Sequence, residues 1–203
     1  INIAAESAYS HNQIRSMSRS LYLTELHKVA VLCVRGNREL LVFEHTGGGV
    51  QVPAGTVEPA EDIAVAAVRE LAEETGMVVG SVTHLFSIEE QGDPDERVAA
   101  ADVPLLAEPR ESAAVVKPSV WRSSVRVREC GGEYTCVAVE SWDLDRDPPV
   151  RTESIDGFVL SAALLRSQQR HIFYAAAPVT ALADTWEISA EGMYTFRCRW
   201  APL

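Results

Sequence analysis

The hydrophobic positions of the chain fall into short runs separated by polar turns, which is typical of a protein rich in strands. The most apolar run, residues 28–34, is continuous, as expected of a strand buried on both faces. Gly36 and Asn37 then mark a turn, and residues 40–43 form the returning strand of a predicted hairpin. A short strand is predicted at residues 50–52.

One segment has the composition of a helix. Residues 62–75 are rich in Ala, Glu, Leu and Arg, and they are followed by Gly76, a residue that favours the left-handed conformation at the end of a helix. The sequence therefore predicts a helix from Asp62 to Thr75.

The rest of the chain is predicted to be mostly strands. Residues 91–119 contain four prolines and indicate a long connection, and Gly131-Gly132 indicates the turn of a second hairpin. Strands are predicted at 78–89, 120–129, 134–143, 171–175 and 194–200, and a short helix at 157–165. This order of strands, helix and strands predicts an α/β or α+β fold.

The net charge of the protein limits the kinds of molecule that it can bind. The 203 residues carry a formal net charge of -11, so the surface repels nucleic acid and anionic membranes, and we expect neither as a partner. If the substrate carries phosphates, a divalent cation is the obvious way to bring it in. The four cysteines show no zinc-binding spacing; Cys130 and Cys136 could form a disulfide, but reduced thiols are the preferred interpretation.

The cellular location is predicted from two features that the given sequence does not contain. Residues 1–19 are polar and serine-rich without the apolar centre of a signal peptide, and no run is long enough to span a bilayer. We therefore expect a cytoplasmic protein.

The predicted helix carries an unfavourable set of acids. Glu70, Glu73 and Glu74 lie at i, i+3 and i+4, on one face beside the apolar stripe of the helix. Like charges at this spacing cost roughly 0.2–0.5 kcal/mol per pair, and more when partly buried. Such acids are usually a solvated face. The alternative is that their oxygens bind Mg²⁺.

The surrounding sequence favours the metal site. Gly55, five residues, Glu61, seven residues, and then Arg69-Glu70-Leu71-Ala72-Glu73-Glu74-Thr75-Gly76-Met77 fill every fixed position of a motif. This stretch resembles the complete Nudix box, a far more specific signal than a short glycine motif. The resemblance implies the Nudix fold, an α/β/α sandwich with a mixed sheet and a loop–helix–loop catalytic motif.

The resemblance also implies roles. Metal ligands would be Glu70, Glu73, Glu74 and the backbone carbonyl of Ala54, and catalytic residues would be Glu73, Glu74 and Arg69, with Mg²⁺ or Mn²⁺ as cofactor. The residues with a structural role would be Gly55, Glu61 and Gly76. Of the later acids (Glu89, Glu90, Glu187, Glu191), Glu191 is preferred as a further catalytic acid. No substrate-binding residue is identified.

Beyond the motif, the chain is longer than a minimal Nudix domain requires. We expect one Nudix domain with its core at about residues 24–95 and 168–203. Residues 96–167 would be an insertion carrying the second hairpin, which could serve as a substrate lid or an arm for homodimerisation.

These features predict a Mg²⁺-dependent pyrophosphohydrolase. It would cleave a phosphoanhydride bond in a nucleoside diphosphate linked to another group, with ADP-ribose, nucleotide sugars and nucleoside triphosphates all open. The alternative is a Nudix-fold module that binds a nucleotide without turnover.

Overall fold

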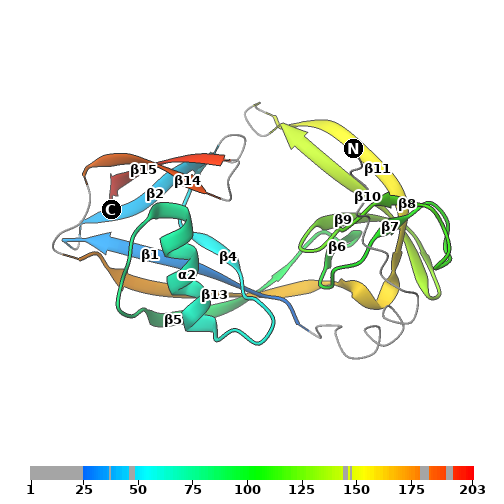
Figure 1. Ribbon diagram of the computed structural model, residues 1–203, viewed down its shortest axis with the longest axis horizontal. Helices are drawn as coiled ribbons and strands as arrows, with labels where there is room; N and C mark the ends of the chain where they lie inside the picture. Colours follow the sequence, from blue (N-terminus) through cyan, green and yellow to red (C-terminus); the bar gives the residue numbers. More distant parts are fainter. Residues whose placement is uncertain are drawn as a thin grey trace, which may run out of the picture.

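The described part of the chain is built around two β-sheets and one α-helix. A computed structural model describes residues 25–36, 38–45, 49–143, 146, 148–178, 183–190 and 194–203. The two sheets, called sheet A and sheet B here, lie side by side, and strands β5 and β13 run between them (Figure 1).

Sheet A is mixed. Its main order is β14-β15-β2-β1-β13-β5, with β3 paired to β2 and β4 paired to β1. Strands β1 and β13 are parallel, and the other pairs are antiparallel. The strands are β1 (His27–Arg35), β2 (Glu39–His45), β3 (Gly49–Gln51), β4 (Ala54–Thr56), β5 (Thr83–Gln91), β13 (Ser167–Ala176), β14 (Thr185–Ala190) and β15 (Tyr194–Pro202).

Sheet B is formed by the chain between β5 and β13, in the order β12-β6-β9-β10-β11-β7-β8. Its elements are β6 (Glu96–Ala99), β7 (Leu105–Leu106), β8 (Val115–Lys117), β9 (Ser124–Gly131), β10 (Tyr134–Asp143), β11 (Val150–Leu160), a 3₁₀ turn (Ser161–Ala163) and β12 (Leu164–Leu165). The predicted hairpin around Gly131-Gly132 is confirmed as β9 and β10.

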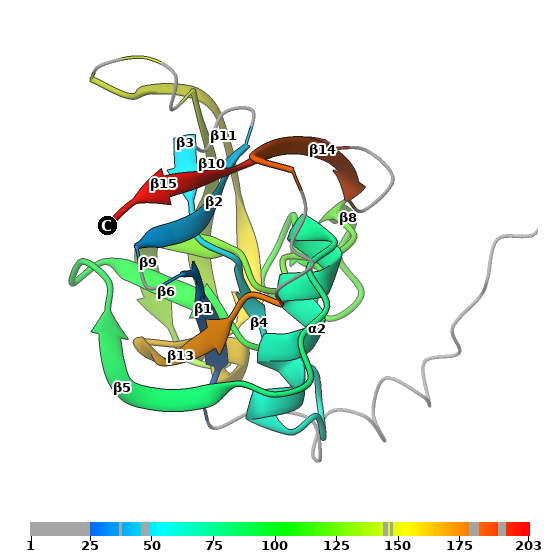
Figure 2. The same cartoon turned by 90° about the vertical axis from the view of Figure 1, so that its left-hand side faces the viewer.

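The helix α2 (Ile63–Thr75) begins one residue later than predicted, because Asp62 is its N-cap. The Asp62 carboxylate accepts hydrogen bonds from the backbone N–H groups of Ala64 and Val65, which have no partner inside the helix. Gly76 ends the helix with φ 70°, the left-handed conformation that glycine adopts without strain. Figure 2 shows α2 packed along one side of sheet A.

Each sheet has its own hydrophobic core. Beneath α2, buried side chains of the helix such as Ala67 and Leu71 pack against Val29 and Val31 of β1 and Phe173 of β13. A second cluster lies on sheet B, around Leu105, Val125, Val137 and Val159. The chain is therefore a mixed α+β protein, which confirms the predicted fold class.

Two predictions about local structure are wrong. Residues 157–165 were expected to form a short helix, but they complete β11, make one 3₁₀ turn and form β12. Residues 91–119 were expected to be a long connection, but they supply β6, β7 and β8. These strands are only two to four residues long and are held by pairing with β9, β11 and β12, so their local sequence gives a weak signal.

The cysteine pair in the second hairpin is not bridged. Cys130 lies opposite Thr135, and Cys136 lies opposite Glu129, so neither thiol faces the other across the hairpin. Both are free thiols, as preferred from the sequence. Among the described residues, no helix is long and apolar enough to cross a membrane.

Candidate functional site

The loop before α2 and the helix itself bring the acids of the motif together. Strand β4 pairs with β1 so that Gly55 lies opposite Val29, a core residue under the helix. Gly55 therefore faces α2, and a Cβ atom added there would overlap the carboxylate of Glu70. The first glycine of the motif leaves the space that the Glu70 carboxylate occupies, and a side chain at position 55 would displace this carboxylate.

Glu70 is the buried acid of the three. The residue is only 8% exposed. Burial raises the pKa of its carboxyl, because the charged form loses water, and the hydrogen bond from Arg69 opposes this in part. A nearby cation therefore stabilises the charged form of this buried carboxyl.

In the structure, the cation beside the Glu70 carboxylate is the guanidinium of Arg69. Its guanidinium donates to Glu61 Oε1 at 2.8 Å and Oε2 at 3.0 Å, and also to Glu70 Oε1 at 2.8 Å and Glu73 Oε2 at 3.0 Å. A further bond reaches the carbonyl of Thr56 at 3.1 Å and ties the helix to β4. The two bonds to Glu61 lower the pKa of that carboxyl, and the carboxylates raise the pKa of Arg69 above its usual value.

The remaining acid of the motif contacts the loop. The Glu74 carboxylate accepts a hydrogen bond from the backbone N–H of Ala54 at 2.8 Å, so these two expected metal ligands lie side by side. Glu73 is turned outward, with 58% of its side chain exposed. The site thus runs from the buried Glu70 to the open Glu73 along one face of α2.

The carboxylate and carbonyl oxygens at this site are of the kind that bind a divalent cation. In the described part of the chain, no three His, Cys, Asp or Glu side chains converge closely enough to enclose a metal ion. Mg²⁺, however, keeps several water ligands and binds proteins through one or two carboxylates, and the site offers hard oxygens beside a backbone loop. Oxygen atoms of Glu70, Glu73, Glu74 and the carbonyl of Ala54 could supply such ligands.

The later acids considered from the sequence are not brought into this cluster by any contact that the structure shows. Glu187 is exposed and pairs with Arg197, and Glu90 pairs with Arg170. Glu191, the preferred further acid, lies outside the described residues.

One neighbour of the motif could not be found by sequence reasoning. Arg122, from the loop that precedes β9, forms an ion pair with Glu58 in the loop before α2. Its guanidinium lies 4.5 Å from the ring centre of Trp121, and its backbone has φ 63°. A positive φ in a non-glycine residue is strained and is found where surrounding contacts enforce it. Arg122 and Glu58 are 64 positions apart, so no local pattern connects them.

A second group missed by the sequence is a chain of hydrogen bonds across β1, β13 and β5. His27 Nδ1 lies 3.0 Å from His171 Nε2, and Ser87 Oγ lies 2.7 Å from His171 Nδ1 and 2.9 Å from His84 Nε2. Burial, together with the neighbouring imidazoles His27 and His84, lowers the pKa of His171.

Comparison with known proteins identifies a similar family domain around the motif. The family model described as the NUDIX domain matches residues 26–119, a range that includes β1, the loop from Gly55 to Glu61 and all of α2. Neither the curated proteins nor the solved structures gave a match to the chain. The complete motif, folded as a loop–helix–loop, lies inside the matched range, and the similarity of residues 26–119 to the NUDIX domain supports membership of the chain in the Nudix superfamily.

Proposed function

We propose that the protein is a Mg²⁺-dependent pyrophosphohydrolase that cleaves a phosphoanhydride bond in a nucleoside diphosphate linked to another group. The observation that carries the proposal is the arrangement around Arg69. The guanidinium holds Glu61, Glu70 and Glu73 together at hydrogen-bonding distance, although like charges at this spacing disfavour the helix.

The proposed roles of the residues are consistent with their positions. Glu70, Glu73, Glu74 and the Ala54 carbonyl would hold the cation, which would neutralise the diphosphate and lower the pKa of the attacking water. Arg69 orients Glu70 and Glu73 through charge-assisted hydrogen bonds.

A glutamate would accept the proton of the attacking water. Glu73 is the most exposed of the three helix acids, and Glu191 stays the predicted further acid. Gly55 leaves room for Glu70, while Glu61 and Gly76 fix the two ends of the loop–helix–loop.

We also propose that residues 96–167 are an insertion into a single Nudix domain. The pairing of Ser167 with Gln91 supports this, because the chain leaves sheet A and returns to it at the same place. The Arg122–Glu58 ion pair connects this segment to the loop of the motif, which supports a role at the substrate side of the domain. Homodimerisation and a cytoplasmic location stay predictions.

A hydrolysis screen tests the proposal. The protein would be incubated with Mg²⁺ or Mn²⁺ and a panel of dinucleotides, nucleotide sugars and nucleoside triphosphates, and the released products would be separated and quantified. We expect turnover of at least one compound, dependent on the cation and reduced by about 100-fold or more in Glu73→Gln or Glu74→Gln.

The matched control is Glu187→Gln, because Glu187 is an equally exposed glutamate whose ion pair, within the part of the chain that the structure describes, is with Arg197. Its activity should equal that of the unmodified protein. Tight nucleotide binding without turnover under any of these conditions would support the alternative, a nucleotide-binding module, and would overturn the hydrolase proposal.

A further inference from the structure

Two arginines at the junction of sheets A and B lack the partners that other arginines of this acidic protein have. Arg126 and Arg128, on the neighbouring strand β9, form ion pairs with Asp95, Glu140 and Asp156. Within the described residues, by contrast, Arg97 and Arg166 form no ion pair. Arg97 donates only to the backbone carbonyls of Pro94 and Glu96, and Arg166 is exposed.

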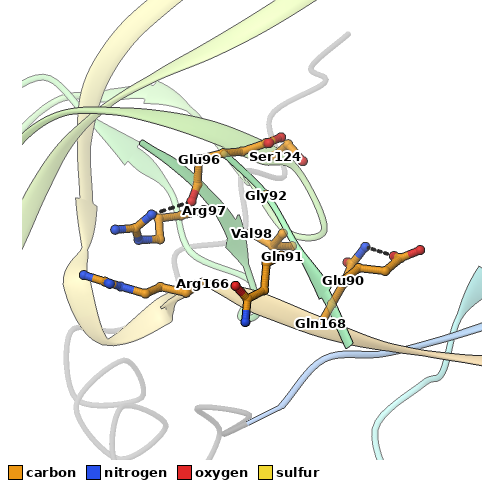
Figure 3. Close-up of a pocket in the computed structure, with 9 residues that line it drawn as sticks. All are labelled: Glu90, Gln91, Gly92, Glu96, Arg97, Val98, Ser124, Arg166 and Gln168. Atoms are coloured by element: carbon orange, nitrogen blue, oxygen red, sulfur yellow. Dashed lines mark hydrogen bonds between the residues drawn. The ribbon is translucent and has the colours of Figure 1, made fainter. Parts of the chain in front are cut away.

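The strand register brings these two positive charges together. Strands β12 and β6 pair Leu164 with Ala99 and Leu165 with Val98, so Arg166 follows and Arg97 precedes the last paired residues of these two strands. Like charges that lie close together on neighbouring strands are destabilising. Figure 3 shows both side chains extending in the same direction, away from the Glu90–Gln168 pair. Such an arrangement is stabilised when an anion lies between the guanidinium groups.

Two hollows of the surface adjoin these arginines, and both side chains line both hollows. The larger one, of about 320 Å³, is bounded by the Gly131-Gly132 turn and by the hydroxyl groups of Thr135 and Ser161. These hydroxyls are 2.7 Å apart and hydrogen-bonded to each other, which leaves one hydroxyl hydrogen free to donate to an anion. The volume lies at the lower end of the range for small-molecule sites.

The smaller hollow, of about 170 Å³, lies between β5, β6 and the start of β13 (Figure 3). One of its lining residues carries a buried acceptor: Gln168 Oε1 is shut off from solvent and has no hydrogen-bond partner among the described residues, while the amide nitrogen of Gln168 donates to Glu90 at 2.7 Å. A buried carbonyl oxygen without a donor is costly. The small hollow therefore favours a ligand group that donates a hydrogen bond.

We propose that Arg97 and Arg166 form a binding site for a phosphate monoester of a polar small molecule. A phosphate monoester carries about -1.5 to -2 charges at neutral pH, which matches two guanidinium groups, and its oxygens accept the paired donors of arginine. The phosphate would lie between the arginines on the side of Thr135 and Ser161. A hydroxyl or amino group of the ligand would reach Gln168. None of the lining residues belongs to the Nudix box, so the proposal does not depend on the proposed hydrolase activity.

Calorimetric titration of the full chain would test this site, with a chelator present to suppress metal-dependent binding at the Nudix box. The probes are AMP, ribose 5-phosphate and inorganic phosphate, with adenosine as the probe that lacks a phosphate. We expect saturable binding of the two monoesters, weaker binding of inorganic phosphate and none of adenosine. Arg166→Gln and Arg97→Gln should each weaken binding by about 10-fold or more, as loss of a charge-assisted hydrogen bond predicts.

Arg110→Gln is the control, because Arg110 is an exposed arginine of the same segment that pairs with Glu108 and lines neither hollow. A second measurement uses Cys130, an exposed thiol that lines the larger hollow. Its rate of alkylation should fall when AMP is bound, and this protection should be lost in Arg166→Gln while the buried Cys33 and Cys198 stay unlabelled. Absence of saturable monoester binding, or binding that both arginine substitutions leave unchanged, would overturn the proposal.

Discussion

Substitution of Gly55 by alanine tests whether the packing of the loop against Glu70 sets the activity. The added Cβ would lie about 1 Å closer to the Glu70 carboxyl carbon than the 3.0 Å that Cβ atoms tolerate. The carboxylate is the far end of a flexible side chain, so we expect the chain to fold and Glu70 to move aside by about 1 Å.

Two magnitudes follow from this displacement. The hydrogen bond from Arg69 Nη1 to Glu70 Oε1, at 2.8 Å, would be lost, which costs about 2 kcal/mol for a bond between charged groups. For a chain of this length, the melting temperature should fall by roughly 4–8 °C. Misplacement of a catalytic group by about 1 Å lowers kcat/KM by roughly 100-fold.

The assay combines a thermal melt with metal-dependent hydrolysis of whichever compound the screen identifies. Gly80→Ala is the matched control, since a Cβ at Gly80 would meet nothing within 4 Å. If Gly55→Ala keeps kcat/KM within about threefold of the unmodified protein, the position of Glu70 does not limit the reaction and the reasoning fails.

Three further predictions concern the residues around the site. Arg69→Gln leaves three carboxylates without their shared cation and should destabilise the protein by about 3 kcal/mol in chemical denaturation, whereas an unchanged midpoint would show that the ion pairs contribute nothing. Asp62→Ala removes the N-cap bonds and should cost about 1 kcal/mol in the same measurement, with Asp62→Asn close to neutral. Because the folded-state pKa of His171 lies below 6.5, the unfolded chain binds more protons as the pH falls through 6.5, and the free energy of unfolding should decrease there. His171→Asn should flatten this pH dependence, and an identical slope in the variant would assign it to other groups.

The sequence by itself determined the helix and the spacing of its acids. The N-cap residue Asp62 and the terminal Gly76 are local signals, and the spacing of Glu70, Glu73 and Glu74 is fixed by the helical repeat. A helix closes its hydrogen bonds within its own segment, so its limits were predicted to within one residue.

Only the tertiary structure decided sheet B and its junction with sheet A. Strands β6, β7 and β12 are stabilised by pairing with segments far along the chain. Their sequences are too short to show a clear preference for the strand conformation by themselves. The same holds for the Arg122–Glu58 ion pair and for Arg97 and Arg166, which line the same two hollows. Contacts between distant segments depend on how the strands pair and how the sheets pack. The residues that determine this pairing and packing are spread over the whole chain and are not contained in any one motif.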